Sequence, residues 1–124
     1  MIAVRHTPGK GRGVFATQKI IAGRLIEEAP VVVMPSHEIQ HLDRIALQDY
    51  YFLWGPEQRA AAIALGACSI CNHSFEPNCD YIRRYDTESI CLVALRDIEP
   101  GEELTINYNG TGIGDRALWF DVLE

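Results

Sequence analysis

The sequence predicts a mainly β fold with one short helical insert, in a single domain that spans residues 1–124. Three observations predict it. The length of 124 residues is that of one ordinary domain. Ten glycines and six prolines divide the chain into short segments. The β-branched or apolar runs between these turn residues are short, which is typical of strands.

The first half of the chain carries most of the predicted strands and the helix. A helix is predicted after Pro35, with Ser36 as its N-cap and a continuation through Ile45 and Leu47. Strands are predicted at residues 2–5, 13–17, 25–28, 31–34 and 50–54.

The second half contains one ambiguous segment and one hairpin. The alanine-rich residues 56–65 follow Gly55 and locally favour a helix, with a turn and a strand as the alternative. Residues 81–85 and 90–95 flank a polar stretch of four residues and therefore predict a hairpin.

A short turn pattern occurs twice. An isoleucine lies three residues before Gly23 and before Gly101, and an isoleucine or leucine lies three residues after each. The repeat is too short for a structural unit, so it predicts the same glycine turn, with positive φ, used twice between strands.

Charge and apolar runs narrow the range of partners. The chain has 17 acidic and 11 basic residues, a balance that argues against nucleic-acid binding and permits a basic partner. No apolar run approaches the ~18 residues of a membrane span, and the N-terminus lacks a signal-peptide pattern. We therefore expect an intracellular protein that binds no membrane.

Four cysteines raise the question of disulfides or zinc. Cys68 and Cys71 form a CxxC pair that could be half a zinc site or a redox pair, but no second pair exists. The surrounding run is apolar and no secretion signal is present, so buried, reduced thiols are the favoured interpretation.

A second metal pattern lies at the start of the predicted helix. His37, Glu38 and His41 match the HExxH pattern of zinc proteases, in which two histidines on one helix face bind zinc beside a general base. The pattern lies in the first helical turn and no third ligand follows at a suitable spacing. A solvated helix start is therefore favoured, and we expect no metal site.

Three further motifs carry more information together than singly. A glycine-rich loop at residues 9–16 precedes a strand and allows close approach to its backbone. Residues 72–79 crowd two asparagines, a histidine and a proline behind an apolar run, which indicates a turn with paired amides or a ligand-binding corner. Residues 99–108 form a turn and a strand that ends in Tyr108.

In this order the motifs resemble the SET domain family. The matching residues are Gly11-x-Gly13-Val14-Phe15-Ala16, then Asn72-His73-Ser74-x-x-Pro77-Asn78, then Gly101-Glu102-Glu103-Leu104-Thr105-x-x-Tyr108. The resemblance covers residues 5–109, most of the chain. Residues 46–50 are especially similar to the minimal viral and bacterial SET proteins. The sequence departs from the family at Phe75, where a cysteine is common, and at Asn107, where an aspartate is usual.

The resemblance implies a fold and an activity. The fold would be several small β-sheets with a C-terminal pseudoknot, which places residues 72–78 beside residues 104–108 and favours a strand at residues 60–65. The activity would be transfer of a methyl group from S-adenosylmethionine to a lysine of a protein or peptide, with histones as one candidate. An inactive SET module that only binds a basic peptide is the alternative.

The resemblance also implies roles for particular residues. Tyr108 would be the catalytic tyrosine and Tyr50 a second wall of the lysine channel. Trp119 and Phe120 would lie against the cofactor or the channel. The backbone of two segments would hold S-adenosylmethionine, namely Gly11, Arg12 and Gly13, with Asn72 and His73. The family's zinc-binding cysteine clusters are absent. A symmetric homodimer is expected, in the cytoplasm of a bacterium or the nucleus of a eukaryotic or virus-infected cell.

Overall fold

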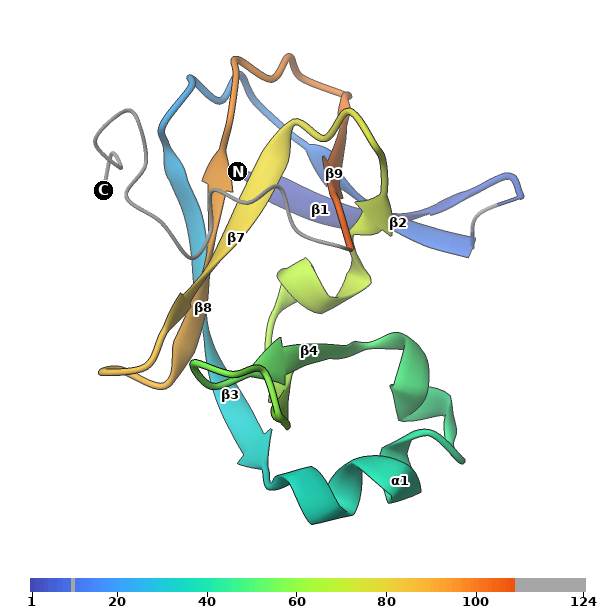
Figure 1. Cartoon of the computed structure of the whole chain (residues 1–124). Coiled ribbons are helices and arrows are strands. Elements are labelled where there is room, and N and C mark those ends of the chain that lie inside the picture. Colours follow the sequence, from blue (N-terminus) through green and yellow to red (C-terminus); the bar gives the residue numbers. More distant parts are fainter. Residues whose placement is uncertain (10, 109–124) are drawn as a thin grey trace.

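The computed structural model describes residues 1–9 and 11–108 as two β-sheets joined by short turns (Figure 1). The fold is mainly β with one short α-helix, as the sequence predicts. No helix within these residues is both long and apolar enough to cross a membrane.

The first sheet has four strands in the order β1-β2-β9-β6. The β1–β2 and β2–β9 pairs are antiparallel, and the β9–β6 pair is parallel. The strands are β1 (Ile2–Thr7), β2 (Gly11–Ala16), β6 (Asn72–His73) and β9 (Glu103–Ile106). β9 thus lies between strands from distant parts of the chain, the arrangement expected for the pseudoknot.

The second sheet has five strands in the order β4-β5-β3-β8-β7, all antiparallel neighbours. They are β3 (Leu25–Met34), β4 (Tyr51–Trp54), β5 (Ala60–Ala64), β7 (Cys79–Arg84) and β8 (Ser89–Ala94). The ambiguous segment therefore contains a strand, as the family resemblance implied, and the hairpin of β7 and β8 is confirmed.

Two predicted strands are one strand in the structure. β3 runs through Pro30, where its partner changes from β8 to β5. The Pro30 carbonyl still accepts a hydrogen bond from the Leu65 N–H at 2.8 Å. The missing proline N–H therefore does not end the strand.

The predicted helix is wrong in extent. Residues 36–49 form three short pieces: the 3₁₀ turn η1 (Ser36–Glu38), the helix α1 (Ile39–Leu42) and the 3₁₀ turn η2 (Ala46–Asp49). Pro35 occupies the N-cap position, and no side chain caps η1. Ile45 and Leu47 are exposed, so the segment has no continuous apolar face whose burial would stabilise a longer helix.

The two turns of the repeated glycine pattern meet in space. Gly23 and Gly101 have φ values of 87° and 86°, the left-handed conformation that the pattern predicts. Ile20 and Ile98, which precede them, form an antiparallel bridge with backbone N···O distances of 2.9 and 2.7 Å. The two similar sequences therefore fold against each other.

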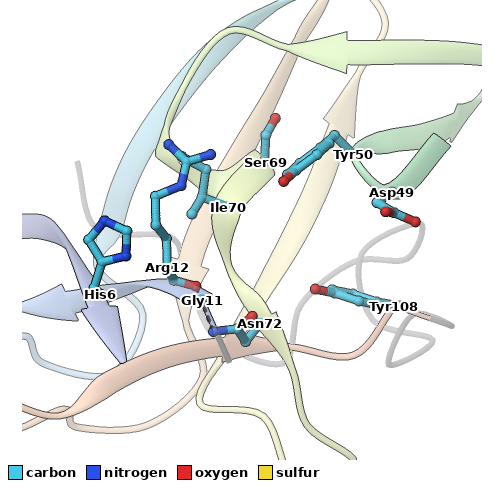
Figure 2. A pocket seen from close by; sticks show the side chains of 9 residues that line it. All are labelled: His6, Gly11, Arg12, Asp49, Tyr50, Ser69, Ile70, Asn72 and Tyr108. Atoms are coloured by element: carbon cyan, nitrogen blue, oxygen red, sulfur yellow. Dashed lines mark hydrogen bonds between the residues drawn. The ribbon is translucent and has the colours of Figure 1, made fainter. Parts of the chain in front are cut away.

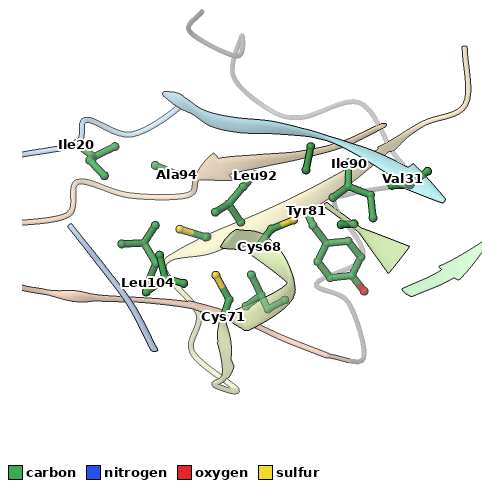
Figure 3. Packing of buried hydrophobic residues seen from close by; sticks show 14 of the residues in the cluster. Ile20, Val31, Cys68, Cys71, Tyr81, Ile90, Leu92, Ala94 and Leu104 are labelled. Atoms are coloured by element: carbon green, nitrogen blue, oxygen red, sulfur yellow. The ribbon is translucent and has the colours of Figure 1, made fainter. Parts of the chain in front are cut away.

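The core lies between the sheets and surrounds the 3₁₀ turn η3 (Ala67–Ile70). Figure 3 shows Cys68 and Cys71 among Leu92, Leu104 and their apolar neighbours. All four cysteines are free and buried, which confirms the prediction of buried thiols. Burial raises the pKa of the Cys79 thiol to about 12, so the thiol stays protonated and unreactive at neutral pH.

Candidate active site

A pocket of about 360 Å³ lies between the β1–β2 hairpin, η3 and the end of β9. Its lining comes from five separate parts of the chain: His6, Gly11, Arg12, Asp49, Tyr50, Ser69, Ile70, Asn72 and Tyr108. In Figure 2, His6 and Arg12 lie on one side, and Asp49 lies with the two tyrosines on the other. The pocket therefore has a basic side and a side that carries a carboxylate and two hydroxyl groups.

The basic side is built by the β1–β2 hairpin. His6 and Arg12 are cross-strand partners in the register of the two strands. Gly11 has a φ of 72°, and a Cβ built on it would meet no atom within 4 Å. The backbone at Gly11 is thus open to a ligand, and the conformation itself favours glycine.

Asn72 links the two halves of the pocket. Its Nδ2 donates to the Arg12 carbonyl at 3.0 Å and to Glu103 Oε2 at 2.7 Å. Both amide hydrogens are thereby used within the protein, and Figure 2 shows the Asn72 oxygen on the opposite side of the amide. The side chain therefore presents a fixed acceptor to a ligand.

Gly13 makes room for this arrangement. A Cβ on Gly13 would lie 2.6 Å from Glu103 Oε2 and 3.2 Å from Asn72 Nδ2. Any larger residue would therefore displace the amide–carboxylate pair. Gly13 does not line the pocket; it lies directly behind it.

Tyr108 closes the side opposite the hairpin. Its hydroxyl donates to the Cys71 carbonyl at 2.9 Å, and its backbone N–H donates to His73 Nδ1 at 3.0 Å. Desolvation by burial raises the pKa of Tyr108, and the negative charge of Asp49 raises it further. The phenol is therefore neutral at neutral pH, and its oxygen can still accept a hydrogen bond.

Tyr108 does not end a strand as predicted. β9 stops at Ile106, which is paired with His73, the last residue of its parallel partner β6. Tyr108 lies two residues further along, and Figure 2 shows its hydroxyl and that of Tyr50 pointing toward the same space. The turn after β9 brings the tyrosine to the pocket.

The nine predicted site residues fall into three groups. Five line the pocket: Gly11, Arg12, Tyr50, Asn72 and Tyr108. The side chain of His73 contacts Tyr108 instead of lining the pocket, and Gly13 lies behind it. Trp119 and Phe120 lie outside the described residues.

The HExxH pattern does not form a continuous helical site. His37 belongs to η1 and His41 to α1, and both side chains are exposed. His37 Nε2 lies 3.8 Å from Glu38 Oε2. Within residues 1–9 and 11–108, no group of three or more histidine, cysteine or acidic side chains is arranged to hold a metal ion.

Four lining residues were not predicted: His6, Asp49, Ser69 and Ile70. His6 lies opposite Arg12 in the register, so a hairpin centred on residues 8–10 would have indicated it. Asp49 is the chain neighbour of Tyr50. Ser69 and Ile70 belong to η3, whose sequence is a short apolar run with no signal for a site.

Comparison with known proteins agrees with the geometry. A family model described as the SET domain matches residues 11–109. A histone-lysine N-methyltransferase of Schizosaccharomyces pombe, specific for H3 lysine-37, is 36% identical over 97% of this chain and 77% of that protein. The H3 lysine-36-specific histone-lysine N-methyltransferase of Saccharomyces cerevisiae is 34% identical over 94% of this chain but only 17% of that protein.

A solved structure agrees as well. The crystal structure of a Plasmodium falciparum protein, named as a candidate histone methyltransferase, superposes with a TM-score of 0.69 at 24% identity, over 90% of this chain and 99% of that chain. This likeness concerns the fold. The family match, in contrast, spans all three motifs and every pocket residue except His6. The chain therefore belongs to the SET domain family.

Proposed function

We propose that the chain transfers a methyl group from S-adenosylmethionine to a lysine side chain of a protein. Membership of the SET family and similarity to proteins named as lysine methyltransferases support the reaction class. The observation that carries the proposal is that the glycine loop, Asn72 and two tyrosines line the same pocket.

The pocket suits this cofactor in size and in chemistry. Its volume of about 360 Å³ falls within the ~300–1,000 Å³ of typical small-molecule sites. The backbone at residues 11–13 and 72–73 would hold the cofactor. His6 and Arg12 suit a carboxylate, and the Asn72 oxygen suits an ammonium or hydroxyl donor. When bound, S-adenosylmethionine supplies an electrophilic methyl group on a positively charged sulfur.

The two tyrosines would align the lysine amine. An amine must lose its proton before it can attack, because an ammonium has no lone pair. The neutral Tyr108 hydroxyl, already donating to the Cys71 carbonyl, has oxygen lone pairs left to accept from the amine. Tyr50 would hold the other side of the side chain. Alignment of this kind can account for several kcal/mol of the barrier, on the order of 7–11 in favourable intramolecular cases.

Tyr108→Phe tests the proposal. The change keeps the ring and removes the hydroxyl, so kcat should fall by about 10²-fold or more while the Kd for S-adenosylmethionine changes little. Stability should fall by about 1 kcal/mol, the scale of one net hydrogen bond. Turnover, cofactor binding and melting temperature are measured on one preparation.

Tyr85→Phe is the matched control. Tyr85 packs edge-on against Trp54, with ring centroids 4.9 Å apart, and does not line the pocket. Its kcat should stay within about twofold of the parent, as for a surface change away from the site. Near-normal turnover in Tyr108→Phe would mean that the active site is elsewhere, and absent cofactor binding in the parent protein would exclude the proposed reaction.

We propose a basic protein segment, such as the H3 tail, as the substrate. Two relatives of this chain are named for lysines of H3, the chain carries a net charge of −6, and Asp49 lies on the tyrosine side of the pocket. A radiolabelled-cofactor assay on core histones and on lysates tests this choice. Label on lysate proteins but not on histones would contradict it.

Metal-free cofactor binding and a symmetric homodimer are further proposals. Calorimetry after chelator treatment should show unchanged cofactor affinity, whereas loss of binding would favour a metal site such as His37 and His41.

For the dimer, Val32 and Leu53 project from one face of the β3–β5–β4 ladder and are 50% and 42% exposed. A monomeric mass by light scattering at micromolar concentration would contradict it.

We propose that Trp119 or Phe120 covers the pocket, lying against the cofactor or the lysine channel. A truncation after Gly112 should weaken cofactor binding or turnover. A folded truncation with full affinity and turnover would refute the role.

If instead the chain were an inactive binding module, the parent protein would bind basic peptides without binding S-adenosylmethionine.

A further inference from the structure

The backbone at Tyr108 lies outside the ladder that holds the rest of β9. The last backbone hydrogen bond of the β6–β9 pair runs from the Ser74 N–H to the Ile106 carbonyl at 2.9 Å. Tyr108 follows two residues later and is 57% exposed. Neither strand pairing nor deep burial therefore fixes its position.

Two hydrogen bonds hold Tyr108 in place of strand pairing, one to His73 of β6 and one to Cys71, the residue that precedes β6. His73 Nδ1 accepts the Tyr108 backbone N–H at 3.0 Å, and the Cys71 carbonyl accepts the Tyr108 hydroxyl at 2.9 Å. The His73 and Tyr108 ring centroids are 5.1 Å apart at an interplanar angle of 51°. The two residues that flank Asn72 thus hold the two ends of Tyr108.

The imidazole has to be in one chemical state to do this. A nitrogen that accepts a backbone N–H carries no proton, so a neutral His73 must have its hydrogen on Nε2. Phe75 packs edge-on against the same ring, with centroids 4.4 Å apart at 89°. The His73 ring therefore has an aromatic neighbour in addition to Tyr108.

We infer that His73 is a positioning residue for Tyr108, acting through its Nδ1 and not through contact with the cofactor or the lysine. The inference rests on the proposed function, because a fixed position of Tyr108 affects turnover only if Tyr108 aligns the lysine amine. A displacement of about 1 Å in a catalytic group can cost about 10²-fold in rate. Loss of the Nδ1 acceptor should therefore lower kcat and leave the backbone of residues 72–73 free to bind cofactor.

A pair of variants separates the two imidazole nitrogens. In His73→Asn the amide oxygen takes the place of Nδ1 and can still accept the Tyr108 N–H. In His73→Gln the amide extends to the place of Nε2. We expect kcat to fall by about 10–100-fold in His73→Gln, and at least about fivefold less in His73→Asn, with the Kd for S-adenosylmethionine within about threefold in both. His37→Asn, at an exposed histidine that does not line the pocket, is the control for the substitution itself.

A measurement on the unmodified protein keeps the test independent of how the variants fold. Nitrogen-15 NMR, recorded at a pH where the imidazole of His73 is neutral, should show its proton on Nε2. A proton on Nδ1 would overturn the inference, as would equal kcat values for folded His73→Asn and His73→Gln. The proposed function fails separately, through absent cofactor binding or an active Tyr108→Phe protein.

Discussion

Asn78 should be the most stability-critical polar residue of the pseudoknot region. It is 2% exposed. Its Oδ1 accepts the Thr105 N–H at 2.8 Å, and its Nδ2 donates to the Glu103 carbonyl at 2.7 Å and to Glu102 Oε2 at 3.2 Å. One side chain therefore satisfies two backbone groups of β9 and one carboxylate.

The cost of Asn78→Ala follows from these contacts. Truncation leaves the Thr105 N–H and the Glu103 carbonyl without their partner, at about 1–3 kcal/mol for each buried group. Because Thr105 and Glu103 are only partly buried, the lower part of that range applies, about 2–4 kcal/mol in total. For a chain of 124 residues, that corresponds to a fall in melting temperature of at least about 6 °C.

Urea unfolding at pH 7 measures the loss, and Asn78→Asp identifies its cause. Aspartate keeps the acceptor for Thr105 but points an oxygen at the Glu103 carbonyl and the Glu102 carboxylate. Its pKa should be raised in the folded state, so its destabilisation relative to the parent should be greatest at neutral pH and should shrink as the pH falls and the new carboxyl binds a proton. Asn78→Ala should show no such recovery. A loss below about 0.5 kcal/mol in folded Asn78→Ala would refute the reasoning, because that is the scale of neutral surface changes.

Three further predictions concern other positions. Gly13→Ala should weaken cofactor binding by about tenfold or more, measured by calorimetry, because its Cβ would strike Glu103 Oε2; unchanged affinity would contradict the assigned role. The Arg96 hydrogen bond lowers the Glu102 pKa below its ordinary 4.5, so the stability it adds is present above that pH and declines below it. Glu102→Gln should remove that part of the acid dependence, by less than about 1 kcal/mol, and an unaltered acid profile would count against it. Ser36→Ala should change stability by no more than about 0.5 kcal/mol, since Ser36 makes no cap bond; a loss near 1 kcal/mol in the same urea titration would show a cap that the structure lacks.

Much of the fold could be predicted because its signals are local. The β7–β8 hairpin follows from two apolar runs around a polar turn, and the positive φ of Gly23 and Gly101 follows from turn chemistry. The helix prediction failed because the length of a helix depends on burial of a continuous apolar face. Only Leu42 of α1 is buried, so the segment breaks into short turns.

The sequence by itself determined which residues are proposed to carry the chemistry: the glycine loop, Asn72 and Tyr108 belong to its motifs, and the family resemblance adds Tyr50. Only the tertiary structure decided how they meet. The parallel register of Asn72 with Thr105 and the hydrogen bond from Tyr108 to His73 join residues whose separation no local pattern encodes. Such contacts form where two sheets bury a common core around η3, and core packing sets their register and distance.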